Sequence, residues 1–167
     1  MIRMIRQQTS YNPIDLEPDI AVGIALPFSS KYGGLFTLNY TTELQAISNL
    51  KNLLLTRKGE RIMLPSFGSS LYDTLFEQIT SDLPIKVKEG LKSDISYWCP
   101  QIIINNIVVE EAESTSTGMM GHGIQIKINF RVDVSQANRT IILFISNNGN
   151  AQIVTDQSKI ISVPKID

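Results

Sequence analysis

The chain has 167 residues, of which 43% are hydrophobic and 19% charged, and its formal net charge is −1. This length suits a single domain with a sizeable core, and the charge excludes a broad basic surface for nucleic acid. The one cysteine, Cys99, excludes an internal disulfide and favours a reducing compartment. The longest apolar run, residues 20–28, is well short of the ~18 residues that span a bilayer. We therefore expect a soluble cytoplasmic protein with no nucleic-acid and no membrane partner.

The first part of the chain, residues 1–40, lacks a helical period. Three prolines and a Gly-Gly pair interrupt it, so we expect an extended N-terminal arm with one short strand at residues 20–26. Such an arm either lies on its own domain, which is the commoner arrangement, or reaches a neighbour.

Three helices are expected next. The first covers residues 42–57, where apolar side chains recur every three or four positions. Thr42 is suited to be its N-cap, and Gly59 is suited to close it. The second covers residues 69–78. The third covers residues 84–98, with Asp82 as a plausible cap, because its apolar stripe has the same spacing and Pro100 stops it.

After the third helix the apolar period changes from about 3.6 to 2, which indicates strands. The expected strands cover residues 102–113, 123–135 and 139–146, followed by two short strand-like pieces near the C-terminus. The fold class is therefore α+β, with three helices packed on an antiparallel β-meander and extended N- and C-terminal arms. We divide the chain into an arm at residues 1–40, a core domain at 41–146 and a strand-like arm at 147–167.

The residues provide little for catalysis. His122 is the only histidine and Cys99 the only cysteine, so a zinc site of the usual type cannot be built. Glu60, Asp73 and Glu77 are candidate carboxylates, but nothing in the pattern places two of them at the separation that a glycosidase needs. There is no phosphate-binding glycine motif. We expect no catalytic residue, no metal and no cofactor.

A dense group of charged and turn-forming residues separates the first two helices. Its members are Arg57, Gly59, Glu60, Arg61, Pro65, Phe67 and Gly68. Charged side chains that are partly buried must pair. Two interpretations stay open: an internal Glu–Arg network that fixes a corner, or an arginine that faces a partner.

Residues 53–80 resemble the signature of the small baseplate wedge protein of contractile-tailed bacteriophages and type VI secretion systems, often labelled "lysozyme-like". The resemblance extends over about residues 40–146. The pattern is a helix ending in T-R-x-G-E-R, then P-x-F-G, then a helix with L-F-E. Its structural residues here are Arg57, Gly59, Glu60, Arg61, Pro65, Phe67, Gly68 and Phe76.

The resemblance implies a sheath initiator in the tail baseplate of a virion, assembled in the host cytoplasm. Six copies would ring the tail tube, pair their strands with arms of tail sheath subunits, and dock on baseplate wedge proteins, with tube or hub proteins as further neighbours. Strand pairing of this kind is β-augmentation at an open sheet edge. A long strand such as residues 123–135, if it lay near an edge, would need protection from aggregation unless a partner covered it. Which strand is the edge stays open.

One position departs from the family pattern. Many relatives end the third helix in a Glu-Pro-Arg triplet that contacts the wedge, and the matching residues here are Cys99, Pro100 and Gln101. Gln cannot reproduce the bidentate contacts of Arg, so docking would use other contacts, with Trp98 as one candidate beside its alternative role in the core. Arg61→Ala is expected to lower stability or abolish assembly.

Two alternatives to a structural role stay open from the resemblance. One is a peptidoglycan hydrolase of the tail, which needs a cleft with two carboxyl groups in different environments. The other is a regulatory binding module, since a bacterial anti-adaptor protein shares this fold family.

Overall fold

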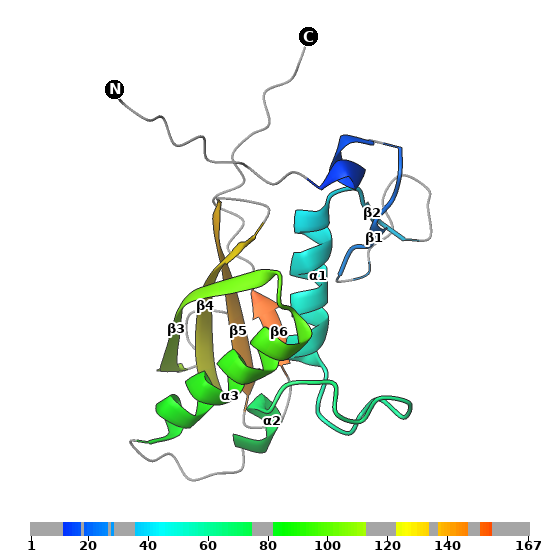
Figure 1. Ribbon diagram of the computed structural model, residues 1–167. Coiled ribbons are helices and arrows are strands. Elements are labelled where there is room, and N and C mark those ends of the chain that lie inside the picture. The colour runs from blue at the N-terminus through cyan, green and yellow to red at the C-terminus, as the bar shows by residue number, and fades with distance from the viewer. Residues whose placement is uncertain are drawn as a thin grey trace, which may run out of the picture.

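The computed structural model describes residues 12–17, 19–26, 28, 36–74, 82–112, 123–133, 137–146 and 151–154. Within these residues the expected α+β class is confirmed (Figure 1). The helices are η1 (Pro13–Leu16), α1 (Thr42–Leu55), α2 (Leu71–Thr74) and α3 (Leu83–Trp98). The strands are β1 (Gly23–Ile24), β2 (Leu38–Asn39), β3 (Ile102–Ala112), β4 (Gly123–Val132), β5 (Asn138–Ser146) and β6 (Ala151–Val154).

The larger sheet is an antiparallel meander in the order β3-β4-β5-β6. Ile128 in the middle of β4 pairs with Ile107 of β3 and Ile141 of β5. The expected long strand corresponds to β4, an inner strand of the meander that lies next to the edge strand β3. Among the described strands, β3 and β6 are the edges of this sheet.

The core lies between one face of the sheet and the helices. Along β4, Ile126, Ile128 and Phe130 are buried and alternate with half-buried polar residues, as expected for a strand with one buried face. Leu50 of α1 and Leu91 of α3 are buried in the same cluster. In Figure 1, α3 crosses the sheet and α1 stands beside β6, so both helices cover the same face.

The helix boundaries differ from the expected ones by one or two residues. Thr41, and not Thr42, is the N-cap of α1, and its hydroxyl oxygen accepts a hydrogen bond from the Leu44 N–H. The helix ends at Leu55 because Thr56 is extended and its hydroxyl donates to the Asn52 carbonyl at 2.7 Å. In α3, the predicted cap Asp82 makes no side-chain capping bond. The expected second helix is described only as far as Thr74, and residues 75–81 lie outside the described residues.

The described part of the N-terminal segment lies against α1. The Asp15 carboxylate accepts hydrogen bonds from the N–H and the hydroxyl of Thr42, both at 2.7 Å. Lys51 donates to the Leu26 carbonyl at 3.2 Å, and burial lowers the pKa of the Lys51 ammonium. The expected strand at residues 20–26 is reduced to β1, which pairs with β2, and η1 was not expected. Residues 1–11 and 155–167, which belong to the two predicted arms, lie outside the described residues.

Candidate functional site: the corner between α1 and α3

Residues 56–70, here called the corner loop, leave the end of α1, project away from the sheet and return to α2 (Figure 1). Two backbone hydrogen bonds close this loop at its base. The Ser69 N–H donates to the Thr56 carbonyl, and the Gly59 N–H donates to the Pro65 carbonyl, both at 2.8 Å. The loop is therefore a defined structure.

Two glycines shape the corner loop in different ways. Gly68 has φ 133°, and a Cβ atom there would lie 2.8 Å from backbone atoms of Thr56 and Arg57. Only a glycine allows both this φ and this close approach of two chain segments. Gly59 has φ 87°, but a Cβ at that position meets nothing within 4 Å. Gly59 does not close α1 as the sequence suggested, since the C-cap is Thr56.

A buried carboxylate fastens both ends of the corner loop to α3. Asp94 is 8% exposed. It accepts hydrogen bonds from the Lys58 ammonium at 2.7 Å, the Ser70 N–H at 2.9 Å and the Ser70 hydroxyl at 2.8 Å. Asp94 was not among the sequence candidates, although its place next to Leu91 and Ile95 of the apolar stripe was a usable signal. Sequence alone cannot join it to residues so far away in the chain.

The charged residues of the signature lie on the surface of the corner loop. The Glu60 carboxylate accepts a hydrogen bond from the Arg57 N–H at 2.9 Å. The guanidinium of Arg57 lies 5.0 Å from the Tyr72 ring centroid, and that of Arg61 lies 4.4 Å from the Phe67 ring centroid. Within the described part of the chain, no ion pair joins Glu60 to either arginine. Cation–π contacts and one backbone hydrogen bond take the place of a Glu–Arg network.

The aromatic residues connect the corner loop to the C-terminal end of α3. The Phe67 and Trp98 rings pack edge-on with their centroids 5.2 Å apart, and the centroid of the Tyr97 ring lies 4.9 Å from that of Trp98. Trp98 is half-buried and packs against the core. Trp98 therefore takes part in core packing, and its role in docking stays a prediction.

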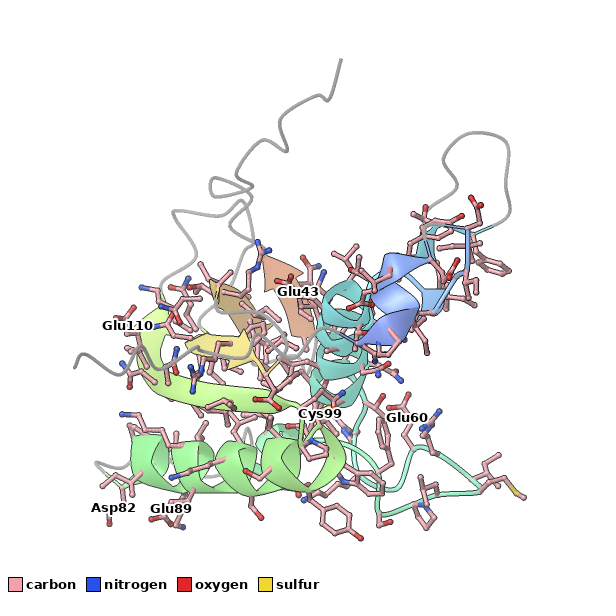
Figure 2. All side chains as sticks on the ribbon, turned by 45° about the horizontal axis from the view of Figure 1, so that its top comes forward. Glu43, Glu60, Asp82, Glu89, Cys99 and Glu110 are labelled. Atoms are coloured by element: carbon pink, nitrogen blue, oxygen red, sulfur yellow. The ribbon has the colours of Figure 1, made fainter. Side chains whose placement is uncertain are left out.

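The three positions that match the family's charged triplet differ in accessibility. Cys99 is 2% exposed, and burial raises the pKa of its thiol from 9.0 to about 11. Pro100 is exposed and Gln101 is half-buried. Figure 2 shows Cys99 at the end of α3. Pro100 is thus the member of this triplet best placed to touch a partner. Phe76, Glu77 and His122 lie outside the described residues.

Beside the corner loop is an open cleft of about 590 Å³, lined by Leu55, Arg57, Lys58, Gly59, Glu60 and Tyr72. Glu60 is the one carboxylate among these lining residues. Burial and the Glu60 carboxylate raise the pKa of the Tyr72 hydroxyl, while Arg57 opposes the shift. Hydrolysis of a glycosidic bond by the usual mechanism needs two carboxylates across the bond, and the residues that line this cleft do not provide them.

The labelled carboxylates do not converge elsewhere either. In Figure 2, Glu43, Glu60 and Glu110 lie on separate parts of the molecule. Glu43 pairs with Arg139 at 2.9 Å and Glu110 with Lys127 at 2.8 Å. The described residues hold no cluster of ligands for a metal ion. None of the helices they form has the length and apolar character needed to cross a membrane.

The geometry thus defines a two-layer α+β protein with a clamped corner loop and no paired carboxylates among the described residues that line the cleft. The family model described as "Baseplate wedge protein gp25" matches residues 45–137, more than half of the 167 residues. The chain belongs to this baseplate wedge protein family.

Two solved structures share the fold. One is a chain of the anti-feeding prophage baseplate, determined by cryo-EM with 6-fold symmetrisation. Its TM-score is 0.55 at 20% identity, and the match covers 66% of this chain and 83% of that one. The other is a Geobacter sulfurreducens protein provisionally described as a tail lysozyme. Its TM-score is 0.50 at 22% identity, and the match covers 61% of this chain and 87% of that one. No curated protein matches the chain at a significant level.

Proposed function

We propose that this chain is a structural component of a contractile-tail baseplate. In this proposal it docks on the baseplate wedge, accepts an extended strand from a tail sheath subunit and so starts the sheath. Family membership supports the baseplate role, and the related fold in a prophage baseplate agrees with it. The assembly would form in the host cytoplasm and hold six copies of the chain around the tube.

The observation that carries this proposal is the open meander with two edge strands. A strand edge presents unpaired N–H and C=O groups that another chain can use. Among the described strands, β3 offers an edge of 11 residues and β6 one of 4 residues. The longer edge supports more main-chain hydrogen bonds, and α1 stands beside β6 (Figure 1). We therefore favour β3 as the strand that receives the sheath arm.

The wedge-docking face in this proposal is the corner loop together with the end of α3. Trp98 and Pro100 offer surface there, while Cys99 is buried. Wedge proteins are the main expected partners on this face, with tube or hub proteins as further neighbours.

Deletion of the gene in particle-producing cells tests the proposed function. The proposal expects baseplates and tubes without sheath, and sheathed particles again after a plasmid copy is supplied. Sheathed particles in the deletion strain would contradict it. A peptidoglycan zymogram of the purified chain is a useful companion measurement, and we expect no lytic band because the described residues that line the cleft include one carboxylate.

A further inference from the structure

The outermost part of the corner loop is an unusual tip for a soluble protein. Ile62 is 94% exposed, Met63 is 95% exposed and Leu64 is 40% exposed. Loop tips normally carry Gly, Asn, Asp or Ser, and runs of three exposed apolar residues are unfavourable unless they have a function. Single exposed apolar residues would need no explanation, but these three are consecutive.

Hydrogen bonds hold this apolar tip in one conformation. The Leu64 N–H donates to the Arg61 carbonyl at 3.1 Å, and the Phe67 N–H donates to the Leu64 carbonyl at 3.0 Å. Behind the tip, the loop base is clamped by Asp94 of α3. A preorganised tip loses little conformational entropy when it binds. This arrangement suits an anchor that inserts into another molecule.

The surroundings of the tip add one aromatic residue and an excess of positive charge. Tyr97, at the end of α3, is 76% exposed and touches Trp98, which in turn touches Phe67 of the loop. The corner loop carries Arg57, Lys58 and Arg61 against one acidic residue of its own, Glu60. Because Lys58 pairs with Asp94 of α3, the excess positive charge comes from the two arginines. A complementary partner has an apolar groove with carboxylates at its rim.

We propose that residues 62–64 form an anchor that inserts into an apolar, carboxylate-rimmed groove on another baseplate protein. This inference rests on the proposed function and deepens it. The anchor offers apolar contact area where Cys99 and Gln101 cannot supply the charges of the family triplet. A groove on a protein is favoured over a lipid surface because the apolar part is a narrow loop tip of three residues.

A matched pair of variants tests the anchor. The double variant Ile62→Ser/Met63→Ser removes the apolar tip, and Ile85→Ser makes the same change on α3, where Ile85 is 57% exposed. Each full-length tagged chain is expressed in the deletion strain, and its amount in purified particles is measured by quantitative mass spectrometry. We expect the amount of the double variant in particles to be lower than that of the wild type by about tenfold or more, as for loss of an interface anchor. The amount of Ile85→Ser should match the wild type. Equal thermal midpoints of all three chains would show that folding is unchanged.

A photo-crosslinker placed at Met63 identifies what the anchor touches. We expect a crosslink to a baseplate protein, at a segment with apolar residues flanked by Asp or Glu. A crosslink to a second copy of this chain or to lipid would overturn the inference. Wild-type levels of the double variant in particles would overturn it too, while leaving the proposed function intact. Absence of the wild-type chain from particles would instead contradict the proposed function, and the inferred partner with it.

Discussion

Replacement of Asp94 by alanine gives the sharpest test of the corner. This carboxylate accepts three hydrogen bonds, at 2.7, 2.8 and 2.9 Å, from Lys58 and Ser70. A hydrogen bond to a charged group contributes about 1.5–3 kcal/mol. The Lys58 side chain is 38% exposed, so solvent reduces its ion pair to at most about 1 kcal/mol. The two bonds from Ser70 therefore carry most of the effect.

We expect Asp94→Ala to lower the free energy of unfolding by about 3–5 kcal/mol, mostly through loss of the two hydrogen bonds from Ser70, at about 1.5–3 kcal/mol each. Asp94→Asn should lower the free energy of unfolding by less, about 2 kcal/mol, because its amide oxygen still accepts a hydrogen bond from Ser70. Lys58→Met, which keeps the aliphatic stem, should lose at most about 1 kcal/mol. For a chain of this size, the largest loss corresponds to a fall in melting temperature of roughly 10 °C.

Urea denaturation followed by tryptophan fluorescence measures these differences, since Trp98 is the only tryptophan. A loss below about 1 kcal/mol for Asp94→Ala would refute the clamp. An equal loss in Lys58→Met and Asp94→Ala would show instead that the ion pair, and not the Ser70 contacts, fixes the corner.

Four further predictions concern the corner loop and the end of α3. Gly68→Ala should lower the free energy of unfolding by about 2–4 kcal/mol because the new Cβ would meet backbone atoms, whereas Gly59→Ala should lower it by only about 1 kcal/mol. Equal losses of unfolding free energy in urea denaturation would contradict this. The Cys99 thiol should resist labelling by a disulfide reagent in the native state, and a rate as fast as in the unfolded chain would count against its burial. The raised pKa of the Cys99 thiol means that this thiol loses its proton at lower pH in the unfolded chain than in the folded chain. The free energy of unfolding should therefore fall between pH 9.0 and about 11, by at most about 3 kcal/mol relative to Cys99→Ala. Parallel plots of unfolding free energy against pH for the two chains would refute this. Arg61→Ala should lower the free energy of unfolding by at most about 1 kcal/mol, because the contact of Arg61 is an exposed cation–π pair with Phe67. A loss of several kcal/mol would reveal contacts of Arg61 beyond that pair.

The sequence predicted the class of fold because apolar periodicity directly reports which side of an element is buried. The alternation from Ile124 to Val132 could only suit a half-buried strand, and β4 has that burial pattern. The stripe of α3 likewise placed Leu91 and Ile95 in the core. Periodicity does not report the order of strands in a sheet, which is why the sequence left the edge strand open.

Features that depend on contacts between distant residues were beyond prediction. The strands β1 and β2 have two residues each, too few to show any period. The Asp15 carboxylate meets Thr42, and Asp94 meets Lys58, only because the folded chain brings them together. At the corner, the sequence showed the turn residues but not the clamp that holds them.

The proposed function requires the open sheet edge to receive a strand from the sheath. A cryo-EM reconstruction of the baseplate from producing cells, with this chain placed in the density, tests this requirement most directly. We expect six copies around the tube, each with a foreign strand hydrogen-bonded along β3. Copies whose β3 and β6 edges both lack such a strand, or a baseplate without this chain, would contradict it.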